Sequence, residues 1–450
     1  MVATVLVVSD LHLTDGGSLE NWGAAQQTAF EELLAATQPG QRLASDSVEL
    51  VINGDCFDFL LTPPALPGRA QTDVNMAHAK WVNIVAAHAP WFAALRTFLQ
   101  TTGHRVTFII GNHDVELFYP SIRARVRSAI GAAPGVVRFC LTQAYQPLPD
   151  VIIDHGCQFD AYNAIPALWA QAATLSTPEQ LETSDARGSA VGPTQLPWGS
   201  RYYYNAFLPA KLRLPYLDAT IPALDFLKQN ALLCLLAPDL VLETLPRLQA
   251  LVPDMTFFVP PIAPADVNDP VALFTATMGI GQLISQSVSG GAASDDAETM
   301  TSGLQLQQAL QGERSAALRA ILAIGPEGIY RSDRGVLAAG TAQLTQAAAT
   351  HFLVLGHTHE EGRWNVAPNQ WIVNTGTWFP RKALPHFDEW TPEFVAWAAH
   401  PQDIPYPGRD GQRFTAAWLR AETGAATVAE LIAWRNGTFT PIADDAMEQW

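Results

Sequence analysis

Histidine, aspartate and asparagine residues follow five apolar segments of this sequence, a setting in which side chains can bind metals or transfer protons. They are Asp10 and His12 after Thr4–Val8, Asp55 after Val48–Ile52, Asn112 and His113 after Val106–Ile110, His155 after Val151–Asp154, and His357 and His359 after His351–Leu355. Short apolar segments rich in β-branched residues predict buried strands, and each gives way here to polar, turn-forming residues. Because ligands collect beyond the carboxyl ends of parallel strands, we expect these side chains to meet at one edge of the fold.

These side chains offer carboxylate or amide oxygens and imidazole nitrogens, without a thiolate. Such a ligand set suits Mn²⁺, Fe or Zn²⁺ better than Ca²⁺. The groups are too many for one ion and fit two ions that share a carboxylate. Two metals about 4 Å apart activate water and stabilise the entering and leaving oxygens during displacement at phosphorus. The other histidines lack this setting and are expected to be structural: His78, His88, His104, His351, His386 and His400.

The ordered motifs resemble those of the calcineurin-like metallophosphoesterases. They are Asp10-x-His12, Gly54-Asp55, Gly111-Asn112-His113-Asp114, His155 and Gly356-His357-x-His359, so the match spans residue 9 to about residue 377. The resemblance implies an α/β (α+β) fold, a four-layer β-sandwich flanked by helices. It leaves a large, mostly helical insertion unaccounted for.

The resemblance also implies a role for each residue. One metal would be held by Asp10, His12, Asp55 and His359, and the other by Asp55, Asn112, His155 and His357, so that Asp55 bridges the two. A metal-bound hydroxide would attack phosphorus while His113, oriented by Asp114, protonates the leaving group as general acid. Asn53 and Asp58 are candidates for supporting these ligands by hydrogen bonds. Manganese is the expected metal, with iron and zinc as alternatives.

The site predicts the reaction class but not the substrate. We expect a dinuclear-metal-dependent phosphoester hydrolase acting on a small-molecule phosphodiester. A phosphomonoesterase or nucleotide-linked pyrophosphatase is the alternative, and a metal-free binding scaffold is a more distant one. Ser9–Leu13 is similar to the lipid-A-pathway pyrophosphatases, although those typically carry arginine where His113 stands. Cys157 stands where relatives often have another histidine.

Three segments are predicted from the pattern along the chain: residues 1–164 and 350–450 as two parts of one metallophosphoesterase core, and residues 165–349 as a helical insertion or cap. Helical spacing covers Glu20–Thr37, Val74–Leu99 and Ser121–Ile130, whose arginines (Arg123, Arg125 and Arg127) read as a solvated face. Further strands are predicted at Val136–Cys140, Trp371–Val373, Phe414–Ala421 and Thr427–Trp434, the last two as a hairpin. In the insertion, Ser184–Gly192 and Gln286–Gly303 read as mobile loops. The Leu-rich segment Ala231–Leu251 fits a packed cap or an apolar substrate pocket.

The composition indicates a globular protein, with 48 % hydrophobic and 15 % charged residues among 450. A formal charge of −17 argues against a protein that holds nucleic acid through phosphate contacts. The four cysteines lack CxxC spacing and are expected to be buried thiols. Met1–Val8 lacks the basic region and cleavage site of a signal peptide, and no apolar run reaches transmembrane length. We therefore expect a cytoplasmic protein; contact with a membrane surface stays open.

Overall fold

A computed structural model describes most of the chain outside its middle. The described residues are 2–64, 71–132, 135–160, 163–175, 181–182, 194–214, 216–217, 220–221, 240, 332–379, 381–383, 392–399, 410–411, 413–423, 425–435 and 437–442. The chain divides into two compact units. The first comprises Met1–Ser200, Asp333–Pro380 and Gln412–Trp450, and the second Arg201–Ser332 and Arg381–Gly411. The three-segment division stays a prediction, and the loops expected at Ser184–Gly192 and Gln286–Gly303 lie outside the described residues, as does Ala231–Leu251 except for Leu240.

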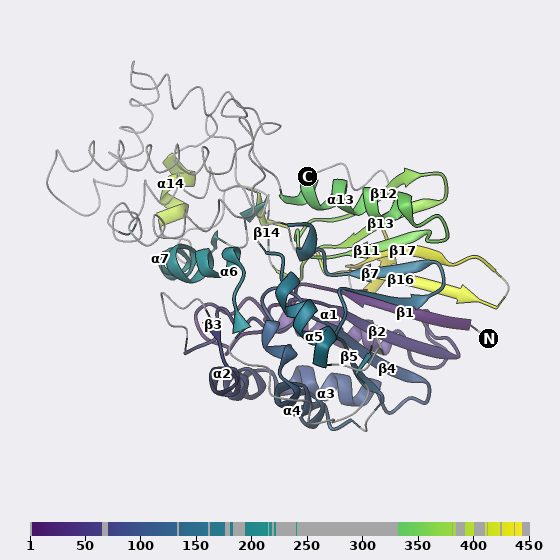
Figure 1. The fold of residues 1–450 in the computed structure, drawn as a ribbon, viewed down its shortest axis with the longest axis horizontal. Helices are drawn as coiled ribbons and strands as arrows, with labels where there is room; N and C mark the ends of the chain where they lie inside the picture. Colours follow the sequence, from purple (N-terminus) through teal and green to yellow (C-terminus); the bar gives the residue numbers. More distant parts are fainter. Residues whose placement is uncertain are drawn as a thin grey trace, which may run out of the picture. The chain divides into compact units, whose positions relative to one another are not determined.

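Two sheets dominate the first unit (Figure 1). The eight-stranded sheet has the order β18-β17-β16-β1-β2-β4-β5-β8, and the five-stranded sheet has the order β12-β13-β11-β7-β6. The strands of the larger sheet are β1 Val2–Val8, β2 Ser47–Asn53, β4 His104–Ile109, β5 Val137–Cys140, β8 Leu181–Glu182, β16 Thr415–Glu422, β17 Val428–Arg435 and β18 Thr438–Pro441. Those of the smaller sheet are β6 Ala144–Leu148, β7 Val151–Asp154, β11 Phe352–Leu355, β12 Glu361–Ala367 and β13 Gln370–Thr375. A separate pair joins β3 Gln71–Thr72 to β9 Thr194–Gln195.

Helices complete the first unit. They are α1 Ala24–Ala35, α2 Val74–Ala87, α3 Ala89–Phe98, α4 Pro120–Ile130, α5 Pro166–Leu175 and α13 Ser332–Gln346, with short 3₁₀ helices η1 Val115–Phe118 and η2 Cys157–Phe159. The second unit contains the π-helix η3 Tyr203–Phe207, α7 Leu208–Arg213, α14 Pro392–Ala399 and a small sheet of β10 Thr220–Ile221, β14 Arg381–Ala383 and β15 Asp410–Gly411. Helix α6 Trp198–Tyr202 contains residues of both units.

Apolar side chains from both large sheets form one buried core between them. Val5 and Val7 of β1, which alternate with Leu6 and Val8, contribute to it together with residues of β7, β11 and β13. The other face of β1 is buried as well, since Leu6 and Val8 have no exposed surface. A strand covered on both sides needs a nearly continuous apolar sequence, which explains why β1, β2 and β4 were readable as buried strands.

Helices cover the outer faces of both sheets, which gives the four layers expected from the sequence. Aromatic residues pack between β4 and helices α2 and α3; Phe57 lies 6.0 Å from Phe108 and 5.2 Å from Trp81 between ring centroids. On the smaller sheet, Val336 and Leu344 of α13 pack against Leu353 and other strand residues. The fold is thus a mixed α/β sandwich. The predicted hairpin of β16 and β17 is confirmed as an antiparallel pair.

The helical predictions need two corrections. The expected helix Val74–Leu99 is two helices, because Pro90 near the start of α3 has no N–H to continue the preceding ladder. Arg123 and Arg127 are buried instead of solvated. Arg123 donates from Nη1 to the carbonyls of Leu117 and Phe118, and Arg127 donates from Nε to the Val137 carbonyl. Only Arg125 is exposed as predicted.

Two sequence expectations on cysteines and membrane spans can be compared with the described part of the chain. Cys56, Cys140 and Cys157 are buried and unpaired, as predicted; Cys234 lies outside the described residues. Where residues are described, none of the helices has the length and apolar character needed to cross a membrane.

Candidate metal centre

The two sheets bring the carboxyl ends of their parallel strands together. In the larger sheet β1, β2 and β4 run parallel, and in the smaller one β7 runs parallel to β11. All eight side chains singled out in the sequence follow these five strands. A contact between the sheets brings residues of the two sheets together. The backbone N–H of His357, which follows β11, donates to both carboxylate oxygens of Asp10, which follows β1, at 3.2 and 3.0 Å.

One group of side chains gathers around Asp10. His359 Nε2 lies 3.3 Å from Asp10 Oδ1, and His12 Nε2 lies 3.9 Å from the same oxygen. The two imidazole Nε2 atoms are 3.2 Å apart. Two neutral imidazole nitrogens cannot both present lone pairs at this distance without a proton or a cation between them. The group thus has the ligand types and spacing for one metal ion.

A second group gathers around Asp55. It consists of Asp55, His155 and His357, with ligand atoms all within 4.8 Å of one another. His155 Nδ1 donates to the Asn53 carbonyl at 2.8 Å, so in the neutral ring Nε2 carries the lone pair, and this atom lies 3.3 Å from Asp55 Oδ2. Asp55 Oδ2 is also 3.9 Å from His12 Nε2 in the first group. Asp55 is therefore placed to serve both groups.

The buried charges of the two groups shift one another's pKa values. Burial opposes charge on His12, but Asp10 and Asp58 outweigh it and raise the pKa of His12 to about 10. Burial likewise opposes charge on His155, yet Asp55 raises its pKa to about 10. Burial disfavours the carboxylate of Asp55, but His155 and His113 hold its pKa well below its usual value. The carboxylates thus attract positive charge, which either protons or metal cations can provide.

Backbone conformation sets these residues apart from the rest of the described chain. Positive φ angles occur at Asp10 (53°), His12 (49°), Asp55 (49°), His357 (69°) and His359 (61°). Asn369 (60°) is the remaining described non-glycine residue with a positive φ. This left-handed region disfavours residues that carry a Cβ, and such strain concentrates at functional sites. Five of six strained residues belong to the predicted ligand set, which points to selection for side-chain position at a cost in stability.

Glycines allow the backbone to approach the same side chains. A Cβ on Gly111 would lie 2.1 Å from Asp55 Oδ1, and a Cβ on Gly54 would lie 2.4 Å from the His155 ring. On Gly356 it would lie 2.6 Å from Asp10 Oδ2. The glycines of the three motifs are therefore needed because any larger residue would displace a carboxylate or an imidazole of the cluster.

Orphaned polar atoms test whether these residues suit a metal. The buried Nε2 of His155 and Oδ1 of Asn112 make no hydrogen bond. Both are lone-pair donors from the predicted ligand set, and leaving such atoms unsatisfied in a protein interior costs about 1–3 kcal/mol each. A divalent cation would satisfy them. The oxygen and nitrogen donors, the sharing of Asp55 and the orphaned atoms therefore fit a pair of divalent ions.

His113 has a different setting from the ligand candidates. Its Nδ1 lies 3.1 Å from Asp58 Oδ2, and the same oxygen lies 2.9 Å from His12 Nδ1. The side chain of His113 is 14 % exposed, against 2 % for His12. Asp58 accordingly orients both rings. Burial would raise the pKa of Asp58, but His113 and His12 outweigh it and keep this pKa well below the usual value. An accessible imidazole held by a carboxylate can exchange protons with a bound molecule.

Asp114 does not occupy the place predicted for it, beside the His113 ring. Its carboxylate accepts hydrogen bonds from the backbone N–H groups of Gly111 and Cys56, at 2.6 and 2.9 Å. Burial and the charge of Asp55 raise its pKa to about 7. Asp114 thus shapes the turns after β2 and β4, and the contact with the His113 ring is made by Asp58. Asn53 joins the sheets, donating from Nδ2 to the Asp154 carbonyl at 3.0 Å.

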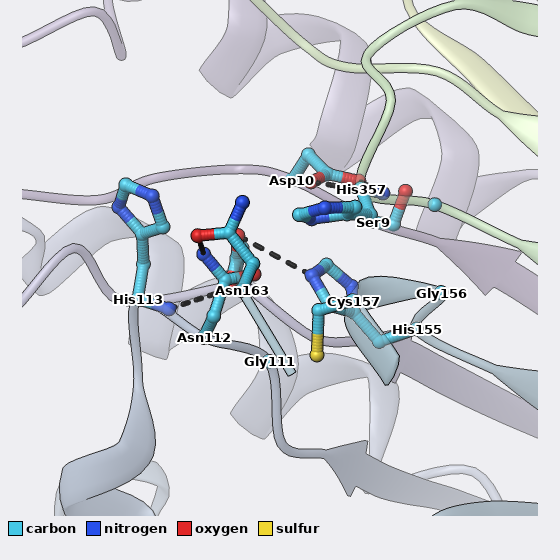
Figure 2. A network of polar contacts seen from close by, with 12 residues as sticks. Ser9, Asp10, Gly111, Asn112, His113, His155, Gly156, Cys157, Asn163 and His357 are labelled. Carbon is cyan, nitrogen blue, oxygen red and sulfur yellow. Dashed lines mark hydrogen bonds and ion pairs between the residues drawn. The ribbon is translucent and has the colours of Figure 1, made fainter. Parts of the chain in front are cut away.

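Two polar residues of this site were not assigned from the sequence. Asp160 Oδ2 lies 3.2 Å from His357 Nε2, and Asn163 Oδ1 accepts from Asn112 Nδ2 at 3.4 Å. Figure 2 shows Asn163 against Asn112, with His155 and His357 nearby. Their signal in the sequence was their position, shortly after His155, but no strand end or glycine marks them.

Comparison with known proteins also points to a phosphoesterase metal site. The family model described as calcineurin-like phosphoesterase matches residues 3–184, a segment that includes every predicted ligand before His357. A search of curated proteins found no match.

Proposed function

Because the chain belongs, through residues 3–184, to the calcineurin-like phosphoesterases, a family of metal-dependent phosphoester hydrolases, we propose that it hydrolyses a small-molecule phosphodiester with two divalent metal ions. One observation carries the proposal. Asp55 contacts a ligand group on either side, with His155 Nε2 at 3.3 Å and His12 Nε2 at 3.9 Å from its Oδ2. A shared carboxylate between two sets of oxygen and nitrogen donors is the arrangement that a dinuclear centre requires.

Seven residues are proposed as ligands on this basis, with Asp55 shared by both metals. The first metal would take Asp10, His12, Asp55 and His359, and the second would take Asp55, Asn112, His155 and His357. When bound, two divalent ions lower the pKa of a water molecule and neutralise charge on the phosphoryl oxygens. The preferred metal is proposed to be manganese, with iron or zinc as alternatives, because the donors are carboxylate, amide and imidazole groups.

His113 is proposed as the general acid. Its ring is partly accessible, and Asp58 accepts from its Nδ1 side, so the proton at Nε2 is the one available to a departing alkoxide. Asp58 also stabilises the protonated ring before transfer. The His113 backbone N–H donates to Asp55 Oδ1 at 2.8 Å, which ties the position of the acid to the shared ligand. This contact would hold the acid at a constant position relative to the proposed metal ligands.

A phosphodiester is the proposed substrate class because of charge. The net charge of −17 repels anions, and the repulsion is weaker for the single charge of a diester than for a monoester dianion. A general acid is also most valuable where the leaving group is a poorly stabilised alkoxide. A phosphomonoester or a nucleotide-linked pyrophosphate is the second candidate, since the same centre can act on either.

The test is hydrolysis of an aryl phosphodiester and the matching monoester by metal-stripped protein refilled with Mn²⁺, with metal content measured in parallel. Faster turnover of the diester would support the proposal. Faster turnover of the monoester would refute the diester as the substrate class and favour a phosphomonoester. Two bound metals without activity on either compound would direct the test to nucleotide pyrophosphates. If the protein binds no metal, the proposal of a metal-dependent hydrolase is refuted and a binding scaffold is favoured.

A further inference from the structure

Two side chains in the segment between β7 and α5 contact proposed ligands that come from different sheets. Asp160 follows η2, and its Oδ2 lies 3.2 Å from His357 Nε2 beyond β11 of the smaller sheet. Asn163 accepts from Asn112 Nδ2, beyond β4 of the larger sheet, at 3.4 Å. Asn163 Nδ2 in turn donates to Asp160 Oδ2 at 2.9 Å. The four side chains thus form one hydrogen-bonded chain across the edge of the sandwich.

The contact with Asp160 decides which nitrogen of His357 can bind a metal. A carboxylate only accepts hydrogen bonds, so the hydrogen of a neutral His357 ring lies on Nε2. The lone pair is then on Nδ1. Carboxylates that hold ligating histidines in this way fix the tautomer and ring orientation and raise the basicity of the ligand. Asp160 is 2 % exposed, so water competes little for this contact.

The contact with Asn163 decides which end of Asn112 faces the proposed metal. Because Asn163 Oδ1 accepts from Asn112 Nδ2, the amide of Asn112 is oriented with its nitrogen toward Asn163 (Figure 2). Its Oδ1 is left buried and without a hydrogen bond. A rotation of the amide by half a turn would present an NH₂ group, which cannot bind a cation.

The position of Asn163 is itself constrained by packing. A Cβ on Gly199 would lie 2.1 Å from Asn163 Oδ1, so glycine at this position leaves room for the carboxamide. The Asn163 and Ala164 backbone N–H groups both donate to the Asp160 carbonyl, at 3.0 and 2.8 Å. Asp160 is therefore linked to Asn163 and Ala164 by backbone hydrogen bonds in addition to the side-chain contacts.

We propose that Asp160 and Asn163 are positioning residues for the second metal, setting the tautomer of His357 and the amide orientation of Asn112. This inference rests on the proposed function, since it requires a dinuclear centre. It makes a specific demand: loss of either residue weakens the metal held by Asp55, Asn112, His155 and His357 and spares the one held around Asp10. Loss of hydrogen-bonding partners of this kind typically lowers metal affinity by about 10–100-fold.

The experiment titrates Mn²⁺ into metal-stripped wild type, Asp160→Asn, Asn163→Leu and Gly199→Ala, with bound metal measured by elemental analysis and magnetic coupling between the two ions followed by electron paramagnetic resonance. Asp160→Asn keeps the shape but can donate to His357 Nε2, which favours the wrong tautomer. Asn163→Leu keeps the volume and releases the Asn112 amide. Gly199→Ala displaces the Asn163 carboxamide without altering any polar group.

A matched control is available in the first unit. Asp150 Oδ2 lies 3.2 Å from His351 Nδ1, a carboxylate–imidazole contact of the same length that involves the other ring nitrogen and lies outside the cluster. Asp150→Asn should bind two ions like wild type. In the three test variants the weaker ion should need about 10–100 times more Mn²⁺, and magnetic coupling should disappear at concentrations that still fill the first site.

The outcomes separate this inference from the proposed function. If wild type binds no metal, the dinuclear proposal fails and this inference fails with it. If wild type binds two ions and the Asp160 and Asn163 variants bind both with unchanged affinity, only the positioning roles are overturned. Equal weakening of both ions in these variants would also overturn them, because it would indicate general loss of structure.

Discussion

Two buried carboxylates from the same stretch of chain have opposite surroundings. Glu49, within β2, is 1 % exposed and is fully paired. Its Oε1 accepts from Thr107 Oγ1 at 2.5 Å and from the Tyr145 hydroxyl at 2.8 Å, and its Oε2 accepts from Arg105 Nε at 2.9 Å. Arg138 also donates to Oε1. Glu49 and these four partners form what we call the Glu49 network.

Asp55, just beyond the end of β2, is equally buried, but some polar atoms beside it have no hydrogen-bond partner. Two atoms of residues proposed to share a metal with it, His155 Nε2 and Asn112 Oδ1, make no hydrogen bond. Asp55 itself has a strained φ of 49°, whereas Glu49 lies in regular strand pairing. Burial of charge therefore does not distinguish a functional site from a structural one. The combination of unsatisfied lone pairs with backbone strain does, because a bound ligand would satisfy the first and offset the second.

The largest effect is expected on removing the shared ligand. Asp55→Ala should remove both metals and activity together, and His357→Ala should remove the second metal and activity, since several kcal/mol of transition-state stabilisation depend on the metals, roughly a thousandfold or more in rate. Elemental analysis and phosphodiester turnover measure the two effects. If the Asp55→Ala protein keeps two metals, Asp55 is not a metal ligand and does not differ from Glu49 in function.

The next effect separates chemistry from metal binding. His113→Ala should keep both metals and lose turnover on alkyl esters by about 10²–10⁴-fold, the usual contribution of general acid catalysis. Aryl esters with good leaving groups should lose much less, since they need little protonation. Rates on both ester types with metal content alongside provide the measurement. Loss of metal in this variant would contradict the role assigned to His113.

The sequence predicted the cluster of candidate metal ligands better than the Glu49 network, for a physical reason. Asp10, Asp55 and His357 stand at strand ends, and a parallel arrangement of strands brings such ends together whatever the details of packing. The partners of Glu49 depend on which strands become neighbours and at what register. Arg138 is 89 positions away from Glu49, and no local pattern marks the pair.

The same limit explains the other differences from the sequence predictions. Arg123 and Arg127 were predicted to be solvated because charged residues usually are, but they donate to backbone carbonyls of η1 and β5. Asp160 and Asn163 lie on a turn, where periodicity carries no information about contacts. Asp114 was assigned to orient His113 from the family resemblance, while its carboxylate accepts from the backbone of two turns. Strands were predictable from local pattern; polar partners required the tertiary arrangement.

Breaking the Glu49 network should affect stability and leave catalysis intact. Glu49→Gln leaves Arg105 and Arg138 without their counter-charge, and removing one member of a buried ion pair costs about 3–5 kcal/mol. We expect roughly 3 kcal/mol, since the Arg105 side chain is 37 % exposed and can be hydrated. Urea unfolding measures the change, and metal content and turnover should match wild type. A loss of metal in Glu49→Gln would contradict the purely structural role assigned to the Glu49 network.

The pH dependence of that loss has a definite sign. Burial disfavours charge on Glu49, but Arg138 and Arg105 outweigh it and hold its pKa below the usual value. Its contribution is therefore fully present above the unfolded pKa of about 4.3 and is lost as the pH falls toward the lower folded pKa. The stability difference between wild type and Glu49→Gln should be largest near about pH 6 and shrink below about pH 4. A difference that grows on acidification would mean that the arginines do not stabilise the carboxylate.

The smallest effect tests the cost of strain in the metal-stripped protein. His359 has a φ of 61°, so His359→Gly should be more stable than His359→Ala by about 1 kcal/mol, although both lack the ligand. Asn369, with a φ of 60° outside the cluster, provides the matched pair of substitutions, and the same gain is expected there. At Glu49, in a regular strand, the order should reverse, because glycine within a strand costs about 0.5–1 kcal/mol relative to alanine. Urea unfolding of the six variants measures all three differences. An alanine variant at His359 as stable as the glycine variant would show that this ligand position is not strained, and would leave the unsatisfied lone pairs as the remaining difference between the two carboxylate clusters.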